Sequence, residues 1–198
     1  MESATLAKAR KIGSTGALIT TAGLLFSVLG RLPIVTLAIG TPLTTAGTIA
    51  IVIALKRISE AIKQPKVYRF ALYSVASTVS GVAAAVLLML AWPPAYASML
   101  GNPDPYMYAF TFLWYYLLGT IAVAVTSTIF AIISALFLKK SLDIVGDRLS
   151  IKTFKTSGLL LVLGAVLAIV IVGIYISIAG YIVLATAFYT IRGESEWP

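Results

Sequence analysis

The chain has 198 residues, a net charge of +8 and a mean hydropathy of +0.99, and only 11% of its residues are charged. Soluble domains carry about 25% charged residues, so this composition excludes an ordinary soluble protein. The absence of cysteine and histidine excludes disulfides, thiolate nucleophiles and the imidazole that most often transfers protons or binds metals.

The charged residues gather in short segments and leave five long uncharged runs. These runs are residues 12–30, 32–55, 70–103, 105–138 and 156–191. Uncharged apolar runs of 18 or more residues are typical of membrane-spanning helices. The sequence therefore predicts an all-α, polytopic integral membrane bundle that forms one transmembrane domain over residues 1–198. We expect no cofactor, no metal and no nucleic-acid partner.

A straight span needs about 20 residues, which divides the runs into six predicted transmembrane helices: 12–30, 34–55, 70–92, 106–138, 154–172 and 176–191. Residues 93–105, "PPAYASMLGNPDP", hold four prolines, so we predict a loop there. The run 156–191 is too long for one span, at about 54 Å for a rise of 1.5 Å per residue. We therefore predict a hairpin that turns near Gly173; a single crossing, giving five spans, is the alternative.

The basic residues predict the orientation of this bundle. With six spans and the N-terminus inside, 14 of the 15 Lys and Arg residues fall on the inner side, and only Arg31 falls outside. Basic loops stay on the cytoplasmic side of a membrane. The sequence thus predicts a multi-pass protein of the cytoplasmic (cell) membrane with both termini cytoplasmic.

Several stretches resemble a known family. They are "AKARKIGSTGALITTAGLL", "AIVIALKRISEAI", "VYRFALY" and "FKTSGLLLVLGAVLAIVIVGIYISIAGYIVLATAFYTIRG". These stretches are similar to an uncharacterised archaeal family of small multi-spanning membrane proteins, domain of unknown function 996. The resemblance covers most of the chain except residues 93–115. It implies an archaeal cytoplasmic-membrane protein and supplies no activity and no site residues.

The predicted spans contain no ionisable residue in their cores. Ionisable groups inside a membrane mark ion pathways and proton relays, so we expect no enzyme and no catalytic residue. Asp143 and Asp147 lie one helical turn apart, and two carboxylates can hold Mg²⁺ at lipid headgroups. We favour the plainer interpretation, in which Lys139, Asp143 and Asp147 are neighbours on a solvated helix face.

The stretch "GTPLTTAGT", residues 40–48, is a candidate intramembrane polar site. Proline removes a backbone hydrogen bond, and threonine hydroxyls then satisfy the freed carbonyls or bind a ligand. The candidate residues are Thr41, Pro42, Thr44, Thr45 and Thr48. A second glycine-containing interruption is predicted at Gly173–Gly180. Paired interrupted helices are typical of transporter binding sites, so a small transporter or channel is the alternative function.

Two basic segments predict contacts with anionic lipid. The candidate residues are Lys56, Arg57, Lys139, Lys140, Lys152 and Lys155. Around the second segment, Leu142, Val145 and Leu149 fall on one side of a helix, which predicts an interfacial helix that lies on the lipid surface.

The stretch "YMYAFTFLWYY", residues 106–116, alternates aromatic residues as a β-strand does. An open strand edge has no place in a membrane, so we predict a helix in which the alternation becomes two stripes at the outer interface. One stripe, Tyr108, Phe112 and Tyr116, is the candidate partner or lipid surface. We expect a non-enzymatic structural or accessory subunit that binds lipids and either further copies of itself or other membrane subunits.

Overall fold

The computed structural model describes residues 2–29, 39–99, 105–168 and 172–191, and for residues 2, 3, 29, 91–99 and 105–112 it describes the backbone alone. The helices are α1 (Glu2–Leu29), α3 (Thr41–Ala61), α4 (Pro65–Met99), α5 (Pro105–Arg148), α6 (Lys152–Val166) and α7 (Val172–Tyr189). The described residues contain no strand. The predicted all-α class is therefore confirmed.

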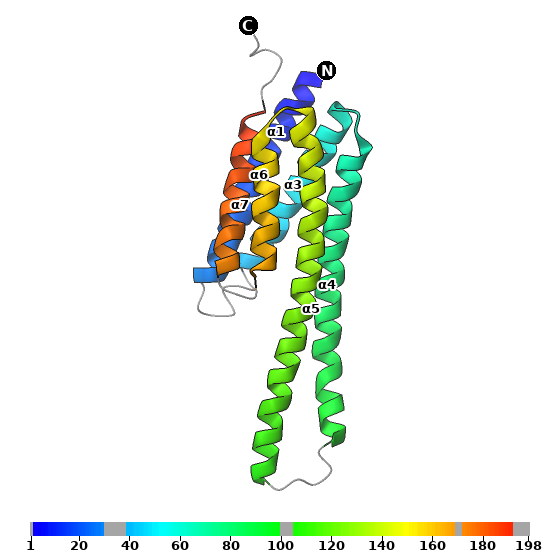
Figure 1. Cartoon of the computed structure of the whole chain (residues 1–198), viewed down its shortest axis with the longest axis vertical. Helices are drawn as coiled ribbons and strands as arrows, with labels where there is room; N and C mark the ends of the chain where they lie inside the picture. Colours follow the sequence, from blue (N-terminus) through cyan, green and yellow to red (C-terminus); the bar gives the residue numbers. More distant parts are fainter. Residues whose placement is uncertain (1, 30–38, 100–104, 169–171, 192–198) are drawn as a thin grey trace.

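Within the described residues, five helices are long and apolar enough to cross a membrane. The exception is α6, which has 15 residues and is about 22 Å long at 1.5 Å per residue. The helices α6 and α7 are antiparallel (Figure 1), so the predicted hairpin is present, but its first helix ends at Val166 and its second begins at Val172. Gly173 therefore belongs to the first turn of α7 and not to the connection.

The six helices run alternately up and down (Figure 1). Each packs against the next along the chain, and α1 packs against α7, which closes the set into a ring. The start of α1, the α3–α4 and α5–α6 turns and the end of α7 lie together. All basic residues that the structure describes lie in the helix turns nearest this end. We call it the basic end and the opposite one the far end.

The α4–α5 hairpin is much longer than the rest of the bundle. Its helices have 35 and 44 residues, or about 52 and 66 Å at 1.5 Å per residue. The hairpin extends well past the far ends of the other four helices (Figure 1). The described backbone of 106–116 is helical, so the alternating aromatic residues belong to a helix and not to a strand.

Glycines hold the α1–α3 pair together. A Cβ added to Gly16 would lie 2.9 Å from the Gly47 carbonyl oxygen, and one added to Gly23 would lie 2.9 Å from the Gly40 oxygen. Real Cβ atoms do not approach backbone atoms so closely, hence only glycine permits these contacts. The two backbones meet at points seven residues apart on both helices, which is the small-residue packing that apolar surroundings favour.

The α6–α7 pair repeats this device once, at Gly164. A Cβ there would lie 2.8 Å from the Ser177 nitrogen and 2.9 Å from the Gly173 carbonyl oxygen. Between the two pairs, the Phe188 ring of α7 packs edge-on against Phe154 of α6, with centroids 5.2 Å apart. The Phe188 ring also covers the position where Gly13 of α1 lacks a side chain. Phe188 thus joins the first and last hairpins.

The apolar core lies at the basic end, where all six helices meet. Its buried residues include Ala9, Ala17, Ile51, Leu55, Ile58, Val67, Ala71, Leu142, Val145, Phe154, Leu184 and Phe188. The predicted interfacial helix is therefore wrong: Leu142 and Val145 are fully buried, and Leu149 packs against the core. Residues 139–148 continue α5, because their apolar face is covered by protein and not by lipid.

The predicted loop at 93–105 is also partly wrong. The α4 backbone remains helical to Met99 and includes Pro93 and Pro94. Proline fixes φ near −65°, a helical value, and removes one hydrogen bond for each ring. The two prolines are therefore tolerated near the end of α4, and the helix continues past them to Met99.

Replacing Gly47 with leucine tests the glycine contacts. Its Cβ would lie 2.5 Å from the Thr20 nitrogen and 2.6 Å from the Gly16 carbonyl oxygen, so Gly47→Leu should force the helices apart and cost about 1–3 kcal/mol. Thermal unfolding in mild detergent, followed by circular dichroism, measures the loss. Ala46→Leu adds bulk at the neighbouring exposed position and should change stability by less than about 0.5 kcal/mol. Equal melting temperatures for Gly47→Leu and Ala46→Leu would contradict the close glycine packing between α1 and α3.

Candidate functional site

The candidate polar stretch at 40–48 lies at the start of α3. Its threonine hydroxyls donate to carbonyls of the same helix: Thr44 to Gly40 at 3.0 Å, Thr45 to Thr41 at 2.9 Å and Thr48 to Thr44 at 2.8 Å. Pro42 occupies the first helical turn, where no intrahelical partner exists for a backbone N–H. The threonines therefore satisfy their own backbone, and a ligand role for Thr41, Pro42, Thr44, Thr45 and Thr48 stays a prediction.

The predicted interruption at Gly173–Gly180 is not seen, because α7 is continuous from Val172 to Tyr189. Both glycines are packing positions. Gly173 contacts the end of α6 at Leu167 and Ala168, and a Cβ on Gly180 would lie 3.0 Å from the Leu161 side chain. The two glycines shape the α6–α7 interface.

The two carboxylates of the acidic pair on α5, Asp143 and Asp147, form ion pairs with different lysines. Asp143 Oδ2 lies 2.6 Å from Lys139 Nζ on the same helix, while Asp147 Oδ1 lies 2.5 Å from Lys155 Nζ on α6. The hydrogen bond with Asp147 raises the pKa of the Lys155 ammonium above its ordinary value. Within the part of the chain that the structure describes, no three acidic residues gather as a metal site would require. Lys139 and Asp143 are the helix neighbours that we favoured, whereas Asp147, the third member of that predicted face, pairs with α6.

The predicted lipid-contacting cations lie at the basic end in different surroundings. Lys139 and Lys155 are the ion-paired residues above. Lys56 lies over the Tyr68 ring at 5.8 Å, and Lys140 lies over the Phe70 ring at 5.9 Å from ammonium to centroid. Arg57 is half-buried and Lys152 is exposed. Contact of these six residues with anionic lipid stays a prediction.

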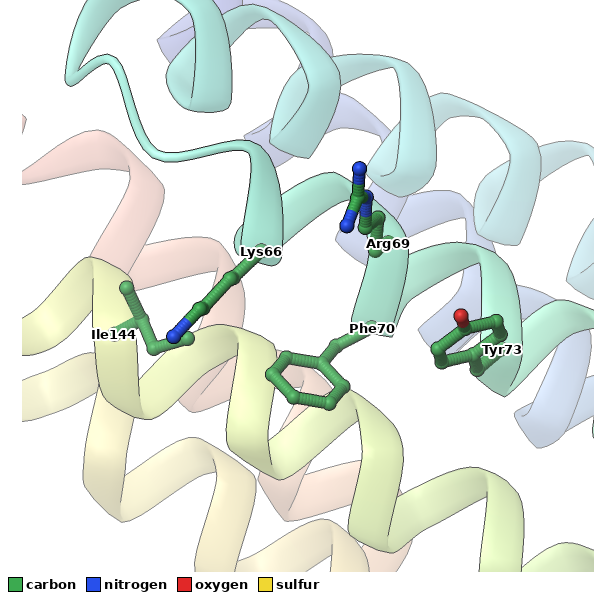
Figure 2. Close-up of a pocket in the computed structure, with 5 residues that line it drawn as sticks. All are labelled: Lys66, Arg69, Phe70, Tyr73 and Ile144. Carbon is green, nitrogen blue, oxygen red and sulfur yellow. The ribbon is translucent and has the colours of Figure 1, made fainter.

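A hollow of about 430 Å³ lies between α4 and α5 near the basic end (Figure 2). It is lined by Lys66, Arg69, Phe70, Tyr73 and Ile144, and we call it the basic hollow. We did not foresee it from the sequence. The signal was present in part: Pro65 marks a helix start, and residues 66, 69, 70 and 73 then share one face. Ile144 is 71 or more residues away from them in the chain, so no local pattern indicated the α5 side of the hollow.

Polar side chains join the two helices of the hairpin inside its apolar length. The Ser134 hydroxyl of α5 lies 2.9 Å from the hydroxyls of both Ser74 and Thr78 on α4. Closer to the basic end, the Ser141 hydroxyl donates to the Val67 carbonyl at 2.9 Å. Such hydrogen bonds between helices resist separation where no water competes for them.

Beyond these contacts the hairpin is strongly apolar and exposed. No residue in the most apolar stretch of Leu113–Arg148 is buried within the protein. Large apolar side chains are exposed along both helices, among them Val79, Val82, Leu87, Leu90, Leu113, Leu118, Ile121 and Ile129. In the predicted aromatic surface, Tyr116 is 67% exposed, whereas the side chains of Tyr108 and Phe112 lie outside the described residues.

Long apolar helices in an antiparallel bundle indicate a membrane protein. The chain belongs to a family of proteins of unknown function, DUF996, whose profile matches residues 43–191. The predicted resemblance to this uncharacterised family is confirmed. The match begins at Leu43, so the first of the resembling stretches, in α1, lies outside it.

A relative supports the same assignment. The uncharacterized protein MJ1644 of Methanocaldococcus jannaschii is 29% identical over 163 residues, which cover 82% of this chain and 87% of the relative. No solved structure matches the chain.

Removing the Ser134 hydroxyl tests the polar junction of the hairpin. Ser134→Ala leaves the hydroxyls of Ser74 and Thr78 without their interhelical partner, and should lower the free energy of unfolding by about 1–2 kcal/mol. Thermal unfolding in mild detergent measures this loss. Ser127→Ala removes an exposed hydroxyl from the same helix and serves as the matched control. Should Ser127→Ala destabilise as much as Ser134→Ala, the junction is not what joins α4 to α5.

Proposed function

We propose that this protein is a non-enzymatic accessory or structural subunit of the cytoplasmic membrane. Its basic end faces the cytoplasm and contacts anionic lipid, and its α4–α5 hairpin binds another membrane protein. The observation that carries the proposal is the apolar surface of the hairpin, which the other described residues leave uncovered.

Lipid accounts for only part of that surface. A bilayer has a hydrocarbon core about 30 Å thick, which about 20 helical residues cross. Counting 20 residues along α5 from Lys139 reaches Gly119, so the helix turns before Gly119 extend past the core. Leu113 and Leu117 in those turns are 64% and 46% exposed. Large apolar surfaces in contact with water mark interaction sites, and a partner that covers this part of the hairpin explains them.

The proposal of a non-enzymatic protein is supported by the kinds of side chain that the sequence contains, rather than by the geometry of a site. The sequence lacks histidine and cysteine, and the adjacent carboxylates Asp143 and Asp147 are each held by a lysine. Neither carboxylate is placed to act with the other as an acid–base pair.

The alternative, a small transporter or channel with a site near Pro42 and Gly173–Gly180, draws no support from the described contacts. The threonine hydroxyls near Pro42 bond to their own helix, and both glycines pack between helices. The accessory role is therefore the one that the geometry supports best.

The proposed orientation is testable because the chain contains no natural cysteine. Ser150→Cys, in the exposed α5–α6 turn, should react with a membrane-impermeant maleimide in inside-out vesicles and not in intact cells. Asp104→Cys, between α4 and α5, should show the opposite pattern. Labelling of both positions from the same side would refute the crossing of the membrane by α5, and labelling with sides exchanged would refute the cytoplasmic basic end.

Site-specific photo-crosslinking tests the partner. A photoreactive phenylalanine analogue at Leu113 should yield a single protein adduct in native membranes, because this end of the hairpin is the proposed contact. The same analogue at Leu18 of α1, which is 56% exposed, should yield lipid adducts alone. An adduct of twice the mass identifies a second copy, and another mass identifies a different subunit. If Leu113 and Leu18 give the same products, the hairpin is no partner site.

A further inference from the structure

The basic hollow has a surplus of positive charge. Lys66 and Arg69 are both exposed, and among the described residues neither makes an ion pair. The nearest carboxylate along α5, Asp143, is held by Lys139 at 2.6 Å. A third cation, Lys140, lies over the Phe70 ring on the same flank of the hairpin. The hollow therefore favours an anion.

An aromatic wall continues from these cations toward the far end. The Phe70 ring stacks on Phe137 of α5 with centroids 6.4 Å apart, and the Tyr73 ring lies 5.5 Å from Phe137. One helical turn further along α5, Ile133 is 37% exposed. The order along the hairpin is cation, aromatic ring, aliphatic side chain. A phospholipid presents phosphate, glycerol and acyl chain in the same order.

The walls of the hollow are held in place by hydrogen bonds. The Ser141 hydroxyl on α5 donates to the Val67 carbonyl, next to Lys66 in the first turn of α4. Two hydrogen bonds close the turn before α4. The backbone N–H of Gln64 donates to the backbone carbonyl of Ser59 at 2.9 Å, and the Ser59 hydroxyl donates to the backbone carbonyl of Gln64 at 2.8 Å. A site whose walls are already ordered loses less entropy when it binds.

The size of the hollow fits a group larger than one ion. Its volume of about 430 Å³ lies in the range of small-molecule sites, about 300–1,000 Å³. Figure 2 shows Lys66 reaching from α4 toward Ile144 of α5, with the Phe70 ring between Lys66 and Tyr73. In Figure 2 the Arg69 side chain lies on the other side of α4 from Phe70, but Arg69 is exposed, so a change of rotamer brings it toward a bound anion, and a guanidinium suits phosphate through two parallel hydrogen bonds.

We propose that the basic hollow binds the phosphate of an anionic phospholipid through Lys66 and Arg69, with Phe70 and Tyr73 against its glycerol and first methylenes. Basic pockets between helices on the cytoplasmic side recognise acidic headgroups in this way. The inference rests on the proposed membrane placement, and it makes one lipid a bound ligand rather than solvent. A soluble phosphate ester would satisfy the cations but gain nothing from the aromatic wall.

Native mass spectrometry of the full-length protein in mild detergent tests the site, with phosphatidylglycerol and phosphatidylcholine as probes. The double variant Lys66→Gln/Arg69→Gln should lower phosphatidylglycerol affinity about tenfold, equivalent to about 1.4 kcal/mol, and Arg69→Lys should lower it less. The matched variant Lys11→Gln/Arg148→Gln removes the same two charge types from exposed positions at the basic end and should change the phosphatidylglycerol affinity less than twofold. Phosphatidylcholine should bind weakly to every form.

Two outcomes would overturn the inference. Equal losses in the two double variants would mean that general surface charge, and not the hollow, attracts the lipid. Competition by millimolar glycerol phosphate would assign the hollow to a soluble phosphate ester. Neither outcome affects the proposed function, which fails separately if the cysteine labelling shows no crossing or if Leu113 gives no distinct adduct.

Discussion

The close approach of helix backbones at glycine is the constraint on which this structure depends. Helices surrounded by lipid gain little by burying apolar side chains, so they associate through short-range packing and hydrogen bonds. Gly16 against Gly47, and Gly23 against Gly40, bring α1 and α3 into backbone contact. Gly164 does the same for α6 and α7. Phe188 then fills the space that Gly13 leaves, which joins the two hairpins and closes the ring.

The α4–α5 hairpin is held differently, and this difference separates its role from that of the other helices. Its helices are joined by Ser134, Ser74 and Thr78 and by the Ser141–Val67 hydrogen bond. Only its basic end enters the common core, where Leu142 and Val145 are buried. The remaining length presents apolar side chains outward. The proposed partner contact rests on this difference between the compact set of helices and the long exposed hairpin.

The charged residues follow the same division. Those that the structure describes lie at the end where the six helices meet, and several have an internal use: Lys139 and Lys155 hold carboxylates, while Lys56 and Lys140 lie over aromatic rings. Lys66 and Arg69 differ because they line a hollow together with Phe70 and Tyr73. This contrast distinguishes a candidate ligand site from the general basic character of the surface, which the positive-inside rule already explains.

The sequence by itself determined the helical class, the six-helix plan and the clustering of basic residues at one end, because each depends on local composition and spacing. It also determined that residues 106–116 are helical, since their surroundings admit no strand edge. Tertiary structure alone decided that α4 continues past Pro93 and Pro94, that Leu142 and Val145 face protein instead of lipid, and that the last hairpin turns before Gly173. Tertiary structure alone also formed the basic hollow, because Ile144 lines it and Phe137 packs against Phe70 and Tyr73 from a distant part of the chain. These outcomes depend on contacts between segments far apart in the chain, and no local pattern encodes which faces will meet.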